Sequence, residues 1–197
     1  MAISNDSRTQ WGWVMYDWAN SSYSLVISTA IFPIYYATVM DGAGKISFPF
    51  FGGNISTTAA YTFVVAAAFL TISLITPYLS ALSEVSGKKK SFMRAFIYCG
   101  SFACAGMFFF TESLIWWGLL SPYLASLCFS GSLVFYNSYL PDIAKIEDQD
   151  SLSARGFALG YLGSSLVLIA SLVFIQNPNW LGINDVALIT RLSFVFV

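Results

Sequence analysis

The sequence predicts an all-α protein, a polytopic bundle of transmembrane helices. Hydrophobic residues make up 57% of the 197 residues and charged residues only 10%, whereas a typical globular domain has about 25% charged residues. The mean hydropathy is +0.69. The apolar residues form successive segments of membrane-spanning length, and Lys and Arg gather between alternate segments. We therefore expect an integral membrane protein.

The first predicted span, residues 14–36, is apolar but carries an aspartate near its start. At helical spacing its polar residues share one face. These are Asp17, Asn20, Ser21, Ser24 and Ser28. Because a carboxylate near hydrocarbon costs at least about 2.5 kcal/mol, this face should turn toward protein or a water-filled cavity. Asp17 is the first candidate for a functional site, and the alternative is a structural Asp bonded to a neighbouring helix.

Four further apolar segments have the length of a span. They cover residues 59–81, 92–110, 114–140 and 155–175. The fourth span contains Pro122, which predicts a tilt or kink. The fifth carries small residues at a spacing that lets two helices approach closely. These are Gly156, Gly160, Gly163 and Ser164.

The connections are polar or rich in turn-forming residues. Loops are expected at residues 41–58, 82–91, 141–153 and 176–185, and a tight reversal at 111–113. One short surface helix fits within 141–153. Asp150, Ser151 or Ser153 can cap the fifth span.

The last apolar segment, residues 186–197, is too short to cross a membrane. A helix of this length reaches only about 18 Å, against a hydrocarbon core of about 30 Å. We therefore expect a truncated sixth helix and treat residues 1–197 as one membrane unit without linkers.

The positive charges predict the orientation of the chain in the membrane. With the N-terminus in the cytoplasm, seven cations lie on that side and only Lys45 lies opposite. The seven are Arg8, Lys88, Lys89, Lys90, Arg94, Lys145 and Arg155. A bacterial inner membrane with a cytoplasmic N-terminus is the expected location.

Composition excludes several function classes. The net charge of −1 argues against a nucleic-acid partner. The absence of histidine removes Ser/His/Asp triads and histidine-ligated metals. Cys99, Cys104 and Cys128 have no CxxC spacing and are interpreted as packing residues. Asp17 is the only carboxylate in a predicted span, so an intramembrane aspartyl protease is not expected. We expect no enzyme, no cofactor and no metal.

Residues 80–90, SALSEVSGKKK, point to a known family. They resemble the signature loop between the second and third helices of the major facilitator superfamily. Leu82, Gly87, Lys88 and Lys89 match that pattern, whereas Ser80, Glu84 and Val85 depart from it. The loop also follows the second predicted span on the cytoplasmic side, where that family carries it.

Further stretches narrow the resemblance: YDWANSSYSLVISTAIFPIYY in the first span, and YNSYLPDIA and LSARGFALGYLGSSL across the fourth and fifth. They resemble the vacuole-effluxer-like branch of the superfamily, which is related to autophagy-linked amino-acid exporters of fungal vacuoles. The resemblance implies a twelve-helix transporter of two six-helix halves, of which this chain is the N-terminal half, with the C-terminal half absent.

In transporters with such repeats, substrate sites lie near the midplane between the halves. The candidate substrate-binding or ion-binding residues are Asp17, Asn20, Ser21, Ser24, Tyr136, Asn137 and Arg191. Arg191 lies in the sixth segment, where we expect it to pair with Asp17 or to bind an anionic substrate.

The loop between the second and third spans forms a second candidate site. Its residues, with one from the fifth span, are Glu84, Gly87, Lys88, Lys89 and Arg155. Glu84 is expected to pair with Arg94 or Arg155, and Gly87 to permit a tight turn. By the resemblance, this loop latches one access state against the second half. The alternative is that its lysines only fix the orientation of the chain.

The expected function is secondary active transport of a small organic solute by alternating access, with amino acids as first candidates. Its partners would be the solute, the bilayer, the missing half or a second copy, and a coupling proton or sodium ion. The alternative is a non-transporting six-helix membrane module, or an inactive fragment of a larger transporter.

Overall fold

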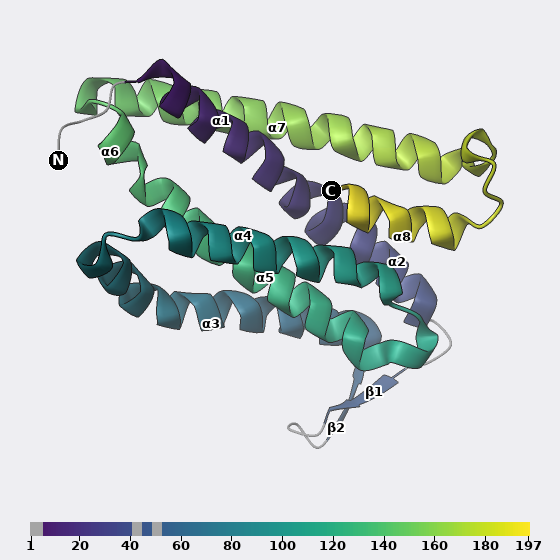
Figure 1. The fold of residues 1–197 in the computed structure, drawn as a ribbon. Coiled ribbons are helices and arrows are strands. Elements are labelled where there is room, and N and C mark those ends of the chain that lie inside the picture. The colour runs from purple at the N-terminus through teal and green to yellow at the C-terminus, as the bar shows by residue number, and fades with distance from the viewer. Residues whose placement is uncertain (1–5, 41–44, 49–52) are drawn as a thin grey trace.

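The computed structural model describes residues 6–40, 45–48 and 53–197, and it confirms the predicted helical membrane bundle (Figure 1). Within the described residues, five helices are long and apolar enough to cross a membrane. They cover Ser7–Met40, Thr57–Ser86, Lys89–Phe109, Glu112–Ile143 and Ile146–Gln176. A shorter apolar helix covers Val186–Phe196.

The first of these helices is longer than predicted and is interrupted by a π-helix. It consists of α1 (Ser7–Ser22), a π-helical segment η1 (Tyr23–Ile31) and α2 (Phe32–Met40). Asp6 caps its start, because its carboxylate accepts the backbone N–H of Arg8 at 3.2 Å. The extra residues at both ends lengthen the helix beyond a minimal span.

The second and third helices meet in a tighter turn than predicted. α3 (Thr57–Ser86) extends through most of the predicted loop 82–91, and α4 starts soon after it (Lys89–Gly106). Gly87 ends α3 with φ +63°, a left-handed conformation that favours glycine. Glu84 therefore lies on a helix rather than in a loop.

The region between α4 and α5 contains two short 3₁₀ turns. They are η3 (Met107–Phe109) and η4 (Glu112–Leu114), and the chain reverses between them as predicted for residues 111–113. The next helix, α5 (Ile115–Ser138), contains Pro122 and remains one helix.

The prediction of a long acidic loop over residues 141–153 is wrong, because most of these residues are helical. A four-residue helix, α6 (Leu140–Ile143), is followed almost at once by α7 (Ile146–Gln176). The expected caps Asp150, Ser151 and Ser153 lie inside α7 instead. Lys145 precedes the helix and makes no side-chain cap. Glu147 and Asp148 in the first turn favour the earlier start, because acidic residues stabilise a helix N-terminus.

The remaining connections contain a hairpin and one more turn. Two short strands, β1 (Lys45–Phe48) and β2 (Gly53–Ser56), pair antiparallel within the predicted loop 41–58. The rest of that loop, 41–44 and 49–52, lies outside the described residues. A 3₁₀ turn, η5 (Pro178–Leu181), leads to α8 (Val186–Phe196).

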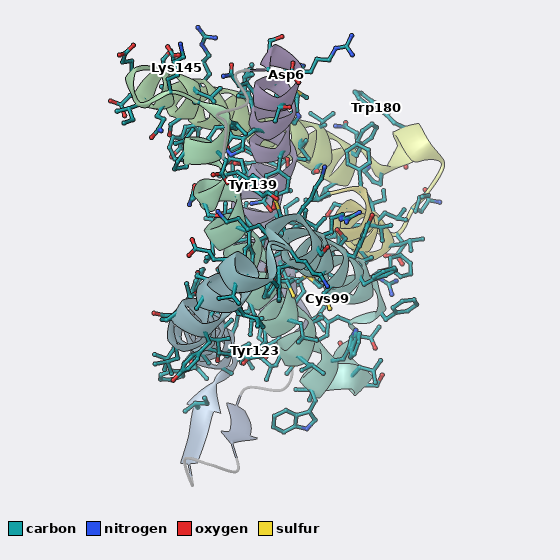
Figure 2. The ribbon with its side chains drawn as sticks, turned by 60° about the vertical axis from the view of Figure 1, so that its left-hand side comes forward. Asp6, Cys99, Tyr123, Tyr139, Lys145 and Trp180 are labelled. Carbon is teal, nitrogen blue, oxygen red and sulfur yellow. The ribbon has the colours of Figure 1, made fainter. Side chains whose placement is uncertain are left out.

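The helices pack as two groups joined by the first span (Figure 1). α1 packs mainly against α7, whereas α5 packs against α3 and α4. The starts of α1 and α7, the α3–α4 turn and α6 lie at one end of the bundle, called here the α6 end. The hairpin and the α7–α8 turn lie at the other, called here the hairpin end. Asp6 and Lys145, which precede α1 and α7, both lie at the top of Figure 2.

Two buried clusters hold the ends of the bundle. At the hairpin end, aromatic rings from α2, α3, α8 and the α4–α5 connection meet, with ring centroids 5.4 to 6.1 Å apart. They belong to Phe32, Tyr36, Tyr61, Phe110 and Phe194. At the α6 end, a smaller cluster includes Trp13, Tyr136 and Leu152. The candidate site lies between them along α1.

Candidate functional site

The small-residue face of α7 packs directly against α1. A Cβ atom built on Gly160 would lie 2.7 Å from Ser21 Oγ and 3.1 Å from Asp17 Oδ2. One on Gly163 would lie 2.6 Å from the Trp18 ring. Such distances leave no room for a side chain, so the glycines allow the close approach predicted for this face.

A recess of about 260 Å³ opens beside this contact. Its lining contains every residue of the predicted polar face except Ser28, namely Asp17, Asn20, Ser21 and Ser24. Tyr161 and Ser164 of α7 and Phe129 of α5 complete much of its wall. The structure therefore brings the first-span candidates together around one space bounded by three helices.

Two polar atoms of this recess are buried without a hydrogen-bond partner. Asp17 is 4% exposed, and its Oδ2 has none among the described residues. Asn20 accepts a bond from Tyr16 Oη at 3.3 Å, but its Nδ2 donor is also unpaired. Buried polar groups in folded proteins are nearly always paired, so these two unpaired atoms make the recess a candidate binding site.

The π-helix η1 changes which residue continues the polar face. An α-helix would place Ser28 on the face of Asp17, but the wider turn places Thr29 in the recess instead. Thr29 Oγ1 donates to the carbonyl of Ser24 at 2.8 Å, five residues back. The carbonyl of Ser28 instead accepts the hydroxyl of Tyr61 at 3.0 Å. The prediction for Ser28 is therefore wrong by one residue.

Tyr136 borders the site, whereas Asn137 does not. Tyr136 is buried and stacks on Trp13, with ring centroids 4.2 Å apart and an interplanar angle of 9°. A Cβ atom on Gly156 would lie 3.1 Å from Tyr136 Oη and 3.5 Å from Asp17 Oδ2. Tyr136 and Asp17 thus both face Gly156, although Tyr136 is not in the lining of the recess. Asn137 is exposed and lines none of it.

Arg191 has a different neighbour from the one predicted. Its guanidinium lies over the ring of Phe108, 5.4 Å from the centroid. Its Nε has no hydrogen-bond partner in the described part of the chain. The expected pair of Arg191 with Asp17 is not formed, because α8 holds Arg191 against the far end of α4 while Asp17 lies against α7.

The predicted pairing of Glu84 with Arg94 or Arg155 is also absent from the described residues. The ion pair found there joins Lys89 Nζ to Asp142 Oδ2 at 3.3 Å, linking the start of α4 to α6. Lys88 is exposed beside it. The Gln10 side chain links α1 to α6 as well, by donating to the carbonyl of Ile143 at 3.0 Å. The α3–α4 turn is therefore fixed to α6 rather than to Arg155.

A second cavity, of about 380 Å³, lies on the other side of Asn20. It is bounded by α1, α4, α5 and α8 and is lined mainly by apolar groups, including Phe96 and Cys104. Asp17 does not reach it. No cluster of three or more potential metal ligands exists in the part of the chain that the structure describes.

Several lining residues were not predicted. Thr29 was missed because nothing in YSLVISTAI, a run without Gly or Pro, signals a π-helix. Tyr161 and Phe129 were missed because apolar residues on a span look alike whether they face lipid or a recess. Ser164 was assigned only to packing, although its spacing four residues after Gly160 does place it on the face toward α1.

Comparison with known proteins agrees with the resemblance. The family model described as "Vacuole effluxer Atg22 like" matches residues 5–196. A Bacillus subtilis (strain 168) protein described as "Uncharacterized MFS-type transporter YxiO" is 35% identical over 164 residues, covering 83% of this chain and 36% of the relative. "Autophagy-related protein 22" of Gibberella zeae (strain ATCC MYA-4620 / CBS 123657 / FGSC 9075 / NRRL 31084 / PH-1) is 23% identical over 175 residues, covering 78% of this chain and 26% of the relative.

No solved structure matches the chain. The chain spans only 36% and 26% of the length of the two relatives. Because the family model covers almost every residue, the chain belongs to the family of vacuole effluxer Atg22-like membrane proteins.

Proposed function

We propose that this chain is part of a secondary transporter, which moves a small organic solute across a membrane by alternating access. Amino acids are the first substrates to test. One relative is described as an MFS-type transporter, which agrees with a role in membrane transport. The other is described as an autophagy-related protein, which agrees with the family. The recess between α1, α5 and α7 is the proposed solute site.

The observation that carries the proposal is the unpaired carboxylate oxygen of Asp17. An acidic side chain within a membrane span is expensive, and such residues usually mark substrate or ion pathways. Asp17 is 4% exposed, lines the recess and has no ion-pair partner among the described residues. The Ser21 hydroxyl, from α1 itself, is a hydrogen-bonding neighbour of the carboxylate, and no described residue donates to Oδ2. A solute cation, a proton or a sodium ion would satisfy this oxygen.

The rest of the mechanism follows the physics of such transporters. The N-terminus is proposed to be cytoplasmic, in a bacterial inner membrane, because most cations lie on that side. The longer protein would supply the opposite wall of the cavity. The α3–α4 turn, with Glu84, Gly87, Lys88 and Lys89, would then face the cytoplasm and latch one access state. Arg155, exposed on α7, lies on the same side.

The test is uptake into proteoliposomes of labelled amino acids under imposed pH and sodium gradients. The 197-residue chain is compared with the product of the full reading frame that contains it. We expect uptake by the longer form. Uptake by the short form alone would favour a dimer of halves, and no uptake by either form would favour the non-transporting module.

The variant Asp17→Asn tests the site within the longer form. We expect a loss of transport of about 10-fold to 100-fold, because a hydrogen bond to a charged group contributes about 1.5–3 kcal/mol. Asp148→Asn is the matched control, since Asp148 is exposed in the first turn of α7, away from the recess. Normal uptake by inserted Asp17→Asn protein would remove Asp17 from the mechanism.

A further inference from the structure

We infer that the recess is built to bind an ammonium group, so that the solute class is small primary amines, with amino acids included only through their ammonium end. The inference rests on the proposed transport function, but its test measures binding and does not require transport. It follows from three properties of the recess: the direction of its hydrogen bonds, its charge and its apolar wall.

The fixed hydroxyl groups of the recess already donate their protons to the protein. Thr29 Oγ1 donates to the Ser24 carbonyl at 2.8 Å. Ser164 Oγ donates to the Gly160 carbonyl at 2.8 Å. A hydroxyl has one proton and two acceptor lone pairs, so both oxygens offer only acceptors to a ligand. An ionised Asp17 Oδ2 is also an acceptor, and it is unpaired. The recess therefore favours a ligand rich in N–H donors.

Neutral donors, among them the hydroxyl of the lining residue Tyr161, are still available, but they do not reverse this balance. Asn20 Nδ2 is unpaired and can donate. The hydroxyls of Ser21 and Ser24 can turn either way. None of these groups carries a positive charge, so a carboxylate bound here would have neutral donors beside the buried charge of Asp17.

No cationic side chain lines the recess in the part of the chain that the structure describes. Arg191, the arginine of α8, lies over the ring of Phe108 and not beside the recess. A ligand carboxylate would therefore be repelled by Asp17 without compensation, whereas an ammonium group would pair with it.

The remaining wall fits an apolar substituent. Phe129, Leu133 and Phe157 line the recess together with Tyr161. Aromatic faces attract cations through their quadrupole, which adds to the preference for an ammonium group. The volume of about 260 Å³ lies just below the common range of about 300–1,000 Å³ for ligand pockets, so the ligand is small.

Three related probes separate the ammonium from the carboxylate: 2-phenylethylamine, 3-phenylpropionate and phenylalanine. They share a benzene ring on a short carbon chain and differ in which charged group they carry. Each is added at millimolar concentration to the purified full-length protein in detergent, and the unfolding temperature is measured. A ligand that binds only the folded state raises that temperature.

We expect stabilisation by 2-phenylethylamine and none by 3-phenylpropionate, with phenylalanine stabilising no more than the amine. Asp17→Asn should remove the shift while still unfolding cooperatively, and Asp148→Asn should keep it. Thr29→Val, which removes an acceptor but no charge, should weaken binding by about 2-fold to 10-fold, in line with a neutral hydrogen bond. It provides a second readout if Asp17→Asn does not fold.

The inference is wrong if 3-phenylpropionate stabilises the protein as well as the amine does, if the amine shift survives in Asp17→Asn, or if no probe produces a shift. Transport of a solute without an ammonium group would leave the proposed function intact and overturn only this inference. Asp17-dependent amine binding without any transport would support the inference and overturn the proposed function.

Discussion

Two helix–helix contacts of this bundle, called here the α4–α5 seam and the α1–α7 seam, contain glycines that let the helices approach closely. The side chains that face these glycines differ between the two. Between α4 and α5, a Cβ atom on Gly131 would lie 2.5 Å from the Phe96 ring, and one on Gly100 would lie 3.0 Å from Cys128 Cβ. Between α1 and α7, the Cβ of Gly160 would meet Ser21 Oγ and Asp17 Oδ2 instead. The first contact is closed by apolar groups, and the second by a hydroxyl and a carboxylate, whose Oδ2 has no partner among the described residues.

The difference separates packing from function. In a membrane, small residues let helices approach closely whatever their neighbours do. The glycine pattern of the fifth predicted span therefore predicts a contact, which is found between α1 and α7. Among the described residues, Asp17 Oδ2 and Asn20 Nδ2 beside the α1–α7 seam are buried without partners, as is Ser130 Oγ on α5. We propose a binding site at the α1–α7 seam because one of its unpaired atoms belongs to a carboxylate that also lines a recess.

Adding one methyl group to an apolar contact of α5 should lower the stability of the protein most strongly. In Gly118→Ala, at the contact of α5 with the α4–α5 connection, the new Cβ would lie 2.2 Å from the fully buried ring of Phe110. Overpacking of this kind lowers the free energy of unfolding by about 1–3 kcal/mol. We expect lower stability in denaturant titrations of the detergent-solubilised protein, with unchanged transport per folded molecule.

The matched variant on the polar side is Gly160→Ala. Its nearest obstacle is the mobile Ser21 hydroxyl, so the loss of stability should be smaller than for Gly118→Ala. Ser21 and Asp17 must shift, however, and binding of 2-phenylethylamine should weaken by about 10-fold, the value of one charged hydrogen bond near 1.5 kcal/mol. If Gly160→Ala lowered stability more than Gly118→Ala and bound the amine normally, the two seams would not differ in role.

The next effect tests the register set by the π-helix. Thr29→Val removes a hydroxyl that lines the recess, whereas Ser28→Ala removes one that does not. We expect the KM for transport to rise about 2-fold to 10-fold in Thr29→Val, since a neutral hydrogen bond contributes about 0.5–1.5 kcal/mol. Ser28→Ala should leave KM unchanged. The reverse result would mean that the segment is α-helical during transport.

The smallest effect is expected at the α6 end. The side chains of Lys89 and Asp142 are 24% and 39% exposed, and such ion pairs contribute about 0–1 kcal/mol. Lys89→Ala should therefore change the unfolding free energy by less than about 1 kcal/mol. A marked loss of transport with normal stability would indicate that this pair belongs to the latch and not only to the fold.

The sequence predicted the helical membrane fold and most of the polar face well. Apolar length identifies spans reliably, and a spacing of three and four residues placed Asp17, Asn20, Ser21 and Ser24 around one recess. Prediction failed where helices continue into polar sequence, as at Ile146, because a helix outside the apolar core needs no apolar residues. It also failed at Thr29, because the π-helix shifts the face although its own residues carry no signal; the nearest signal is Pro33, two residues beyond it, which has no backbone N–H to donate.

The wrong pairings have a different cause. Arg191 and Glu84 were matched to opposite charges from a short list of candidates, and charge alone does not give distance. The packing of α8 against the far end of α4 gives Arg191 an aromatic neighbour. At the α3–α4 turn, Lys89 pairs with Asp142, and Glu84 is exposed. Such choices depend on tertiary packing that no local pattern contains.

We propose that the α1–α7 seam borders a binding site that water can reach, whereas the contact of α5 at Ser126 is packed. The most direct test of this proposal is the reaction of single cysteines with a membrane-impermeant cationic thiol reagent. Cys99, Cys104 and Cys128 are first replaced by Ala in the full-length protein, which must retain transport. Ser24→Cys lines the recess, whereas Ser126→Cys is buried on α5, where Ser126 Oγ lies 2.9 Å from Tyr23 Oη.

We predict that Ser24→Cys reacts, that 2-phenylethylamine slows the reaction, and that Ser126→Cys remains unmodified. An unreactive Ser24→Cys, or a reaction that the amine does not slow, would contradict the claim that this seam borders a binding site.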